Sequence, residues 1–142
     1  MRMEIYHAMQ RFIDIRCDTQ SIQELENIVS KKAQMKHATN GNIPNFAYGR
    51  SHVSELCQKH LFGKKELIGV MFKEREGKPL LELQFVEDKY ENGKINKYAF
   101  HERIVFQFKE KKEKIKISLI DINVQRIALS CIQVPSLSER TD

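Results

Sequence analysis

Residues 80–108, LLELQFVEDKYENGKINKYAFHERIVFQF, carry the clearest structural signal in the chain. Apolar and polar side chains alternate on both sides of a central Asn92-Gly93 pair, which is the pattern of two half-buried strands. Asn-Gly between alternating strands is the strongest short-range hairpin signal, because both residues tolerate the positive φ of a type I′ turn. The stretch therefore predicts an antiparallel hairpin that turns at Asn92-Gly93.

Weaker turn signals on either side extend this hairpin into a sheet. Glu76-Gly77 and Lys111-Lys112, each taken as a two-residue turn, continue the apolar face of the central hairpin onto neighbouring strands. The pairs predicted on the apolar face include Phe85–Phe100, Phe72–Leu81 and Phe108–Ile115, and those on the opposite, polar face include Val86–Ala99, Gln84–His101 and Glu82–Arg103. Because a slip of one residue would invert a strand's pattern, the agreement among three turns favours this register.

Five alternating runs in all predict a meander, whereas the first 63 residues have a helical period. The runs cover residues 67–73, 80–87, 98–109, 114–120 and 126–134, with 121–124 as the last turn. Ile5, Met9, Phe12, Ile13 and Arg16 share one face of a first helix, and Val53, Leu56, Cys57 and His60 share one face of a third. Between them, Ser21 and Glu24 have the spacing of a capping box, which predicts a second helix that fades near residue 37.

The connection between the second and third predicted helices, residues 38–50, is long for a compact domain. It carries Phe46, Tyr48 and Arg50. Long connections are often functional, which makes these three residues a candidate site. The alternative, which we favour for the aromatic pair, is that the two rings pin the connection to the core, since aromatic side chains usually bury most of their area.

These periods predict one α+β domain over residues 1–142, in which three N-terminal amphipathic helices pack on one face of a five-stranded antiparallel meander sheet. The helical layer spans 1–63, the sheet 64–135, and a short polar tail 136–142. Helices followed by an antiparallel sheet form an element order that is similar to the nuclear-transport-factor-2-like fold. It is also similar to small ribonucleases of the barnase and RelE-toxin type. Both resemblances concern element order alone, and no stretch matches either family's motif, so they imply no site residues.

Composition narrows the classes of function. The chain has 142 residues, of which 41% are hydrophobic, and no apolar run is long enough to span a membrane. Its three scattered cysteines predict reduced thiols in a cytoplasmic protein. No Gly-rich phosphate loop or HExxH motif is present. Cys57-x-x-His60 has no second ligand pair, so we predict neither a metal nor a cofactor.

Basic residues on the predicted polar face suggest an anionic partner. The chain holds 24 Lys+Arg against 19 Asp+Glu, a net charge of +5. The candidate binding residues are Arg103, Lys109, Lys111, Lys112, Lys114, Lys116 and Arg126. Clustered lysines can follow phosphates, so the leading prediction is a small basic protein that binds nucleic acid, RNA first, through this sheet face. The alternative is a solvated hairpin tip, because Glu110 and Glu113 lie among the lysines.

Glu82, His101 and Arg103 form a candidate catalytic cluster on the same face. Cleavage of RNA by internal transesterification needs a base, an acid and a cation for the charged transition state. The three residue types supply those roles, which gives the hypothesis of a metal-independent ribonuclease. The alternative, to which we give more weight, is a cross-strand ion pair on a wet sheet face, which contributes a fraction of a kcal/mol.

Glu102 is unusual because it falls on the apolar face, between Phe100 and Ile104. A buried carboxylate is costly unless it is paired or neutral. It could therefore sit at a sheet edge, reach a helix cation, turn outward on a bulge, or line a helix–sheet pocket with His60. The pocket hypothesis predicts that Glu102→Leu stabilises the fold and abolishes ligand binding.

Two functions without nucleic acid stay open on this evidence. One is a protein that binds a small ligand in the helix–sheet pocket. The other is a non-catalytic interaction or inhibitory module of phage or mobile-element type, which pairs with a protein partner or with a second copy of itself. Small size and the absence of a catalytic motif fit the second function.

Overall fold

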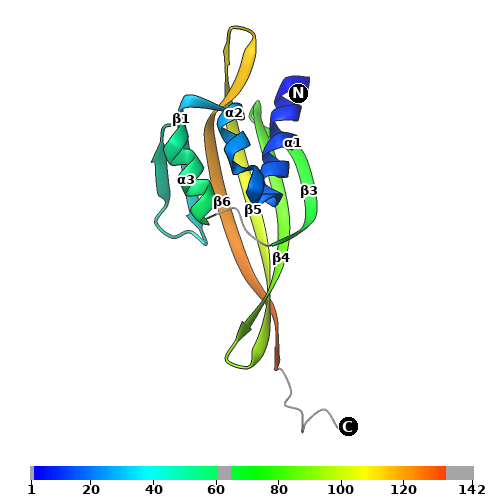
Figure 1. Cartoon of the computed structure of the whole chain (residues 1–142). Coiled ribbons are helices and arrows are strands. Elements are labelled where there is room, and N and C mark those ends of the chain that lie inside the picture. Colours follow the sequence, from blue (N-terminus) through cyan, green and yellow to red (C-terminus); the bar gives the residue numbers. More distant parts are fainter. Residues whose placement is uncertain (1, 61–64, 134–142) are drawn as a thin grey trace.

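The computed structural model describes residues 2–60 and 65–133, without the side chains of 19–21 and 130–133. The elements are α1 (Met3–Cys17), the 3₁₀ helix η1 (Thr19–Glu24), α2 (Leu25–Ile28), β1 (Val29–Thr39), β2 (Asn45–Tyr48), α3 (Arg50–His60), β3 (Glu66–Arg75), β4 (Lys78–Glu91), β5 (Lys94–Lys111) and β6 (Lys114–Gln133) (Figure 1). The predicted polar tail, 136–142, and the side chain of Cys131 lie outside the described residues.

The strands form one six-stranded mixed sheet in the order β2-β1-β6-β5-β4-β3. Neighbouring strands run antiparallel except for β1 and β6, which are parallel. Figure 1 shows the long strands bending behind α1, α2 and α3, with the β5–β6 hairpin projecting beyond the helices at one end. The pairing of β1 with β6 therefore brings an early and a late segment of the chain side by side.

The central hairpin is confirmed together with its register. Phe85 pairs with Phe100 and Val86 with Ala99, and the polar face has the predicted Gln84–His101 and Glu82–Arg103 pairs. The β3–β4 hairpin turns at Glu76-Gly77 as predicted and pairs Phe72 with Leu81. Glu76 and Asn92 both have φ of 53°, and each precedes a glycine with positive φ, as the type I′ turn requires.

The predicted fold class is wrong in the N-terminal half of the chain. Residues 29–39, expected in a second helix, form β1, and residues 45–48, expected in a connection, form β2. Ala33, Met35 and His37 are buried while the residues between them are exposed, which is a period of two. The sequence predicts a helix here for two reasons. Alanine and lysine are depleted in strands, so the alternation of residues 33–37 is a weak strand signal. The helical spacing of Leu25, Ile28 and Val29 just before this segment is the stronger signal.

The predicted meander is also wrong at its C-terminal end. The β5–β6 turn lies at Lys112-Glu113, one residue later than expected, and both residues have positive φ. This shift alone pairs Phe108 with Ile117 instead of Ile115, and an irregularity between Gln107 and Phe108 then moves the register by one more residue, so that Gln107 pairs with Leu119. Residues 121–124, expected to form a turn, lie inside β6, where they pair with both β1 and β5.

One hydrophobic core lies between the helices and one face of the sheet, here called the inner face. This face carries Phe85, Phe100, Glu102 and Ile104, and the opposite, outer face carries Glu82, His101 and Arg103. The α1 and α3 helices contribute Phe12 and Val53, among others, to the same core. The ring centroids of Phe12 and Phe106 lie 5.4 Å apart in an edge-to-face arrangement, which fixes α1 against β5.

Among the described helices, none combines the length and apolar character needed to cross a membrane.

The alternating burial of β1 can be tested by substitution at neighbouring positions. We expect Met35→Ala to lower the free energy of unfolding by about 2–5 kcal/mol, because it opens a cavity in the core. His37→Ala should cost about 0.5–3 kcal/mol, and Lys36→Ala less than about 0.5 kcal/mol. Urea denaturation measures all three. A helix would turn residues two apart to opposite sides, so full tolerance at His37 would contradict the strand.

Candidate functional site

A buried ion pair joins α1 to the inner face of the sheet. Arg16 donates from Nε to Glu102 Oε1 at 3.3 Å and from Nη2 to Oε2 at 2.7 Å. The two side chains are 0% and 1% exposed. Arg16 lies in the last turn of α1, where the helix dipole favours a cation. Glu102 thus reaches a helix cation, one of the predicted alternatives, and neither turns outward nor sits at a sheet edge.

The third nitrogen of this guanidinium is buried and uncommitted. Arg16 Nη1 has no hydrogen-bond partner among the residues that the structure describes. The Phe85 ring lies under the group, with its centroid 4.3 Å from Cζ, and supplies no hydrogen-bond acceptor of ordinary strength. Leaving a buried donor unpaired costs about 1–3 kcal/mol. The geometry therefore favours a polar acceptor next to Nη1.

Lys65, just before β3, adds a second cation near the ion pair. Its Nζ lies 4.0 Å from the centroid of the Phe100 ring, and the residue is half-buried. Burial lowers the pKa of Lys65, while the nearby Glu102 carboxylate acts in the opposite direction and Arg16 lowers the pKa further. Arg16 and Lys65 therefore both interact with the same inner-face carboxylate, that of Glu102.

His37 brings a neutral imidazole to the inner face. The residue is 5% exposed, and its Nδ1 has no hydrogen-bond partner within the described part of the chain. Burial, with smaller contributions from the nearby His60 and Lys65, lowers the pKa of His37 to about 4. The His60 ring stacks on His37 with centroids 5.4 Å apart. His60, the predicted pocket residue, is itself exposed at the end of α3. The buried histidine of this pair is therefore His37.

Cys57 is packed as a core residue of α3. Its Sγ lies 3.5 Å from the Met35 Sδ, and burial raises the pKa of the thiol to about 12. A thiol with so high a pKa is a poor nucleophile at neutral pH. Nor do the described residues contain any group of three His, Cys, Asp or Glu side chains that could hold a metal ion.

The predicted catalytic cluster does come together on the outer face. Glu82 lies 3.8 Å from His101 Nε2 and 3.9 Å from Arg103 Nε, and Lys73 Nζ lies 3.0 Å from its Oε2. The hydrogen bond from Lys73 is the main reason that the pKa of Glu82 lies below its usual value. His101 and Arg103 also line a hollow of about 380 Å³ with Asn123 and Gln125. The catalytic roles of the three residues stay a prediction.

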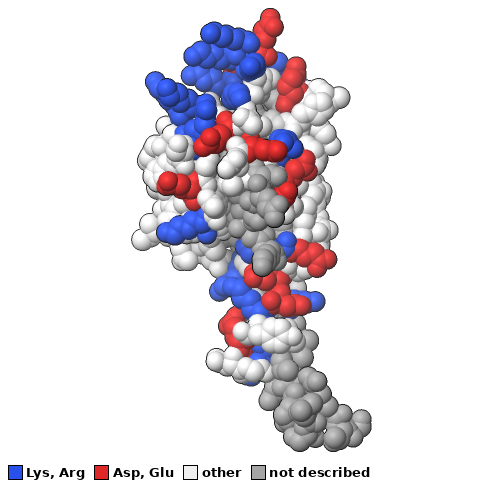
Figure 2. Space-filling model, viewed as in Figure 1, with Lys and Arg blue, Asp and Glu red and all other residues white. Residues whose placement is uncertain are grey.

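The predicted basic binding face is not continuous. Lys109, Lys111, Lys112 and Lys114 are exposed around the β5–β6 tip, and Figure 2 shows basic side chains gathered at this end with acidic ones among them. Lys116 instead donates to the backbone carbonyl of Asn27. Arg126 lies at the other end of the sheet, with its Cζ 5.0 Å from the Tyr98 centroid. The late β5–β6 turn moves the lysines away from His101 and Arg103.

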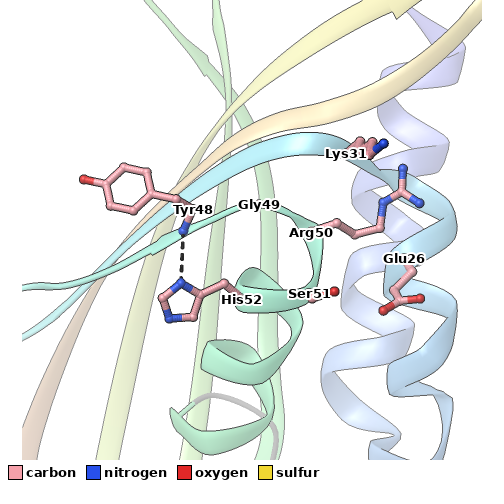
Figure 3. Close-up of a pocket in the computed structure, with 7 residues that line it drawn as sticks. All are labelled: Glu26, Lys31, Tyr48, Gly49, Arg50, Ser51 and His52. Carbon is pink, nitrogen blue, oxygen red and sulfur yellow. Dashed lines mark hydrogen bonds between the residues drawn. The ribbon is translucent and has the colours of Figure 1, made fainter.

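The three residues of the predicted connection lie close to one another in the chain, with Phe46 and Tyr48 on β2 and Arg50 at the start of α3. Phe46 and Tyr48 are exposed on β2, so the favoured expectation that they pin a loop to the core is wrong. Tyr48 and Arg50 instead line a surface hollow of about 490 Å³ with Lys31, Glu26 and His52. Figure 3 shows the Tyr48 ring pointing away from Arg50, and the Tyr48 backbone N–H donating to His52 Nδ1 at 3.4 Å. Glu26 offsets part of the positive charge of this hollow.

Comparison with known proteins identifies the fold. No protein-family model matches the sequence, and no curated protein matches it. Among solved structures, a hexachlorocyclohexane dehydrochlorinase (LinA) type 2 matches with a TM-score of 0.57 at 7% identity, over 94% of this chain and 90% of that one. An NTF2-like protein of unknown function from Mesorhizobium loti matches with a TM-score of 0.56 at 10% identity, over 85% and 90%.

A third similar structure comes from work on de novo proteins with diverse pocket structures. It matches with a TM-score of 0.55 at 11% identity, over 84% of this chain and 97% of the designed one. Identities this low show the fold alone, which is NTF2-like. The likeness agrees with one of the two families whose element order the sequence was found to resemble.

These findings contradict the leading functional prediction. A nucleic-acid-binding protein was expected to present one basic sheet face, but the basic residues are divided among separate places. The structures that share the fold include a dehydrochlorinase and a designed protein from work on pocket structures. The prediction of a protein that binds nucleic acid is therefore wrong, and the helix–sheet ligand site is the better-supported alternative.

The ion pair gives a first prediction about this site. Glu102→Leu should lower the free energy of unfolding by about 3–5 kcal/mol, because it strands the Arg16 charge in the core. This corrects the expectation that Glu102→Leu stabilises the fold. The double variant Arg16→Met/Glu102→Leu should recover most of the loss. Urea denaturation of both variants checks this, and a stable single variant would contradict the pairing.

His37 gives a prediction about pH. Its folded pKa, about 4, lies below its ordinary value of 6.5, so the folded state holds fewer protons between these values. The stability that neutral His37 contributes is complete above the ordinary pKa of 6.5, and it is lost as the pH falls through the folded pKa of about 4. We expect the free energy of unfolding to drop from about pH 7 to about pH 5 by more in the wild type than in His37→Phe, which keeps an aromatic ring but cannot titrate. Equal drops by urea denaturation would contradict this.

Proposed function

We propose that the protein binds a small organic molecule between its helices and the inner face of the sheet, beside Arg16 and Glu102. The observation that carries this proposal is the buried Nη1 of Arg16, a hydrogen-bond donor with no partner in the described residues. A ligand oxygen placed there would satisfy the donor.

The surroundings of the ion pair have the composition of a small-molecule site. Such sites are mostly apolar, with a few convergent polar groups that fix orientation. Here the apolar side chains of the surrounding core include Leu83, Phe85 and Phe100, and the buried polar groups of the same layer are those of Arg16, Glu102 and His37. Buried polar groups of this kind give orientation and specificity, because water does not compete for them.

The shared fold supports the same reading of the site. Among the similar structures, the dehydrochlorinase is named for hexachlorocyclohexane, a small molecule, and the designed protein comes from work on pockets. The hollows at His101 and at Arg50 are lined by partly exposed side chains, so water weakens their charges and hydrogen bonds. A protein partner, a homodimer and a cytoplasmic location stay predictions from the sequence.

The methionines provide reporters that separate interior from surface binding. Met9 and Met35 are buried in the core, and Met35 contacts Cys57. Met3 and Met71 are exposed, the latter on the outer side of β3. We would label the methionine methyl groups with ¹³C and record spectra with a set of aromatic and alicyclic fragments that includes acids, amides, alcohols and amines.

We expect at least one fragment to shift the Met35 methyl signal saturably while the Met3 and Met71 signals stay in place. The double variant Arg16→Met/Glu102→Leu, which keeps an apolar core but has no guanidinium, should lose that response. If every fragment leaves Met9 and Met35 unmoved, or if the double variant responds as the wild type does, the proposed function is wrong.

A further inference from the structure

The charges of the inner face do not balance. Arg16 and Glu102 neutralise each other through two hydrogen bonds, and Lys65 adds a further positive charge beside them. Glu87 and Lys89 also act on the pKa of Lys65, in opposite directions and more weakly than Glu102 and Arg16. His37 is neutral at physiological pH and leaves this sum unchanged. One positive charge is therefore held at a half-buried position, where solvent compensates it less than at the open surface.

The two cations are arranged alike. Each lies over an aromatic ring, with Arg16 Cζ 4.3 Å from the Phe85 centroid and Lys65 Nζ 4.0 Å from the Phe100 centroid. Phe85 and Phe100 are paired residues of β4 and β5, so the cations flank one cross-strand pair. Glu102 takes the N–H of Nε and one N–H of Nη2, so Nη1 is the nitrogen of this guanidinium that has both of its N–H groups left for an incoming group.

Resting on the proposed function, we infer that the ligand is a small aromatic or alicyclic carboxylate whose negative group lies between Arg16 Nη1 and Lys65 Nζ. The carboxylate offers one oxygen to each cation and cancels the unbalanced charge. Its ring packs against the apolar inner face near Phe85 and Phe100. An amine at the same place would meet two positive charges, and a neutral amide would satisfy Nη1 without compensating Lys65.

Matched acid and amide pairs test the charge of the ligand directly. We would titrate benzoate against benzamide, and cyclohexanecarboxylate against cyclohexanecarboxamide, and follow the Met35 methyl signal. Hydrogen bonds to a charged acceptor are roughly twice as strong as those between neutral groups, which predicts about tenfold tighter binding of each acid. The Met3 and Met71 signals report binding elsewhere on the surface.

Lys65 is the better position for a variant, because removing Arg16 alone would strand Glu102 in the core. Lys65→Met keeps an unbranched side chain over Phe100 and removes the charge. We expect it to weaken acid binding by about tenfold and to leave amide binding unchanged. Lys65→Arg should retain the preference for the acid. Lys36→Met, at an exposed lysine of β1, is the matched control and should change neither affinity.

The outcomes separate this inference from the proposed function. If acid and amide bind equally well at Met35, the interior site stands and the anionic ligand is wrong. Acid binding that survives Lys65→Met unchanged would also overturn the inference, because the second cation would play no part. If no probe reaches Met35 in the wild type, both the inference and the proposed function fail.

Discussion

A charge placed in an apolar core must find an opposite charge there, and in this protein that constraint ties the helical layer to the sheet. The Arg16–Glu102 pair links the last turn of α1 to the middle of β5, and neither side chain is exposed to solvent. Any displacement of α1 along the sheet would break two hydrogen bonds and leave two buried charges, a penalty of several kcal/mol for each ion. The apolar contacts around the pair, such as that of Phe12 with Phe106, tolerate small shifts far better because they are non-directional.

Local chemistry made part of this architecture predictable. The β4–β5 hairpin follows from alternation around Asn92-Gly93, and its register follows from the turn alone. The strand β1 could not be found in the same way, because after Val29 its buried positions are Ala33, Met35, His37 and Ala38, of which only Met35 is strongly apolar. Its parallel pairing with β6 joins residues far apart in sequence, and no turn residue records that partnership. The β5–β6 register failed for a smaller reason, since Lys112-Glu113 adopts positive φ without the glycine that usually signals it.

The residues of the site also differ in whether the sequence alone could reveal them. Glu102 stands out in the sequence because a carboxylate interrupts an apolar face, and Arg16 interrupts the apolar stripe of the first helix in the same way. Each anomaly is local, so each is visible, but their pairing depends on how α1 docks. Lys65 has no such signal, because it sits among other basic residues before β3 and only the structure places it near Glu102. Net charge was a poor guide for this reason: exposed lysines at the β5–β6 tip dominate the count, yet water and salt screen them.

A purely structural role does not account for the arrangement of the buried charges. Well-packed apolar side chains of similar volume are often at least as stabilising as a buried ion pair, so stability alone gives little reason to keep one. A pair that served only to fix α1 would also need no second cation, and its guanidinium would have every nitrogen bonded. Instead Arg16 Nη1 lacks a partner in the described residues. Lys65 adds a positive charge that Glu102 does not neutralise, because Glu102 is already paired with Arg16. Both departures from a balanced pair lie over the paired rings of Phe85 and Phe100, and both favour a negative group, so recognition of such a group explains them with one cause.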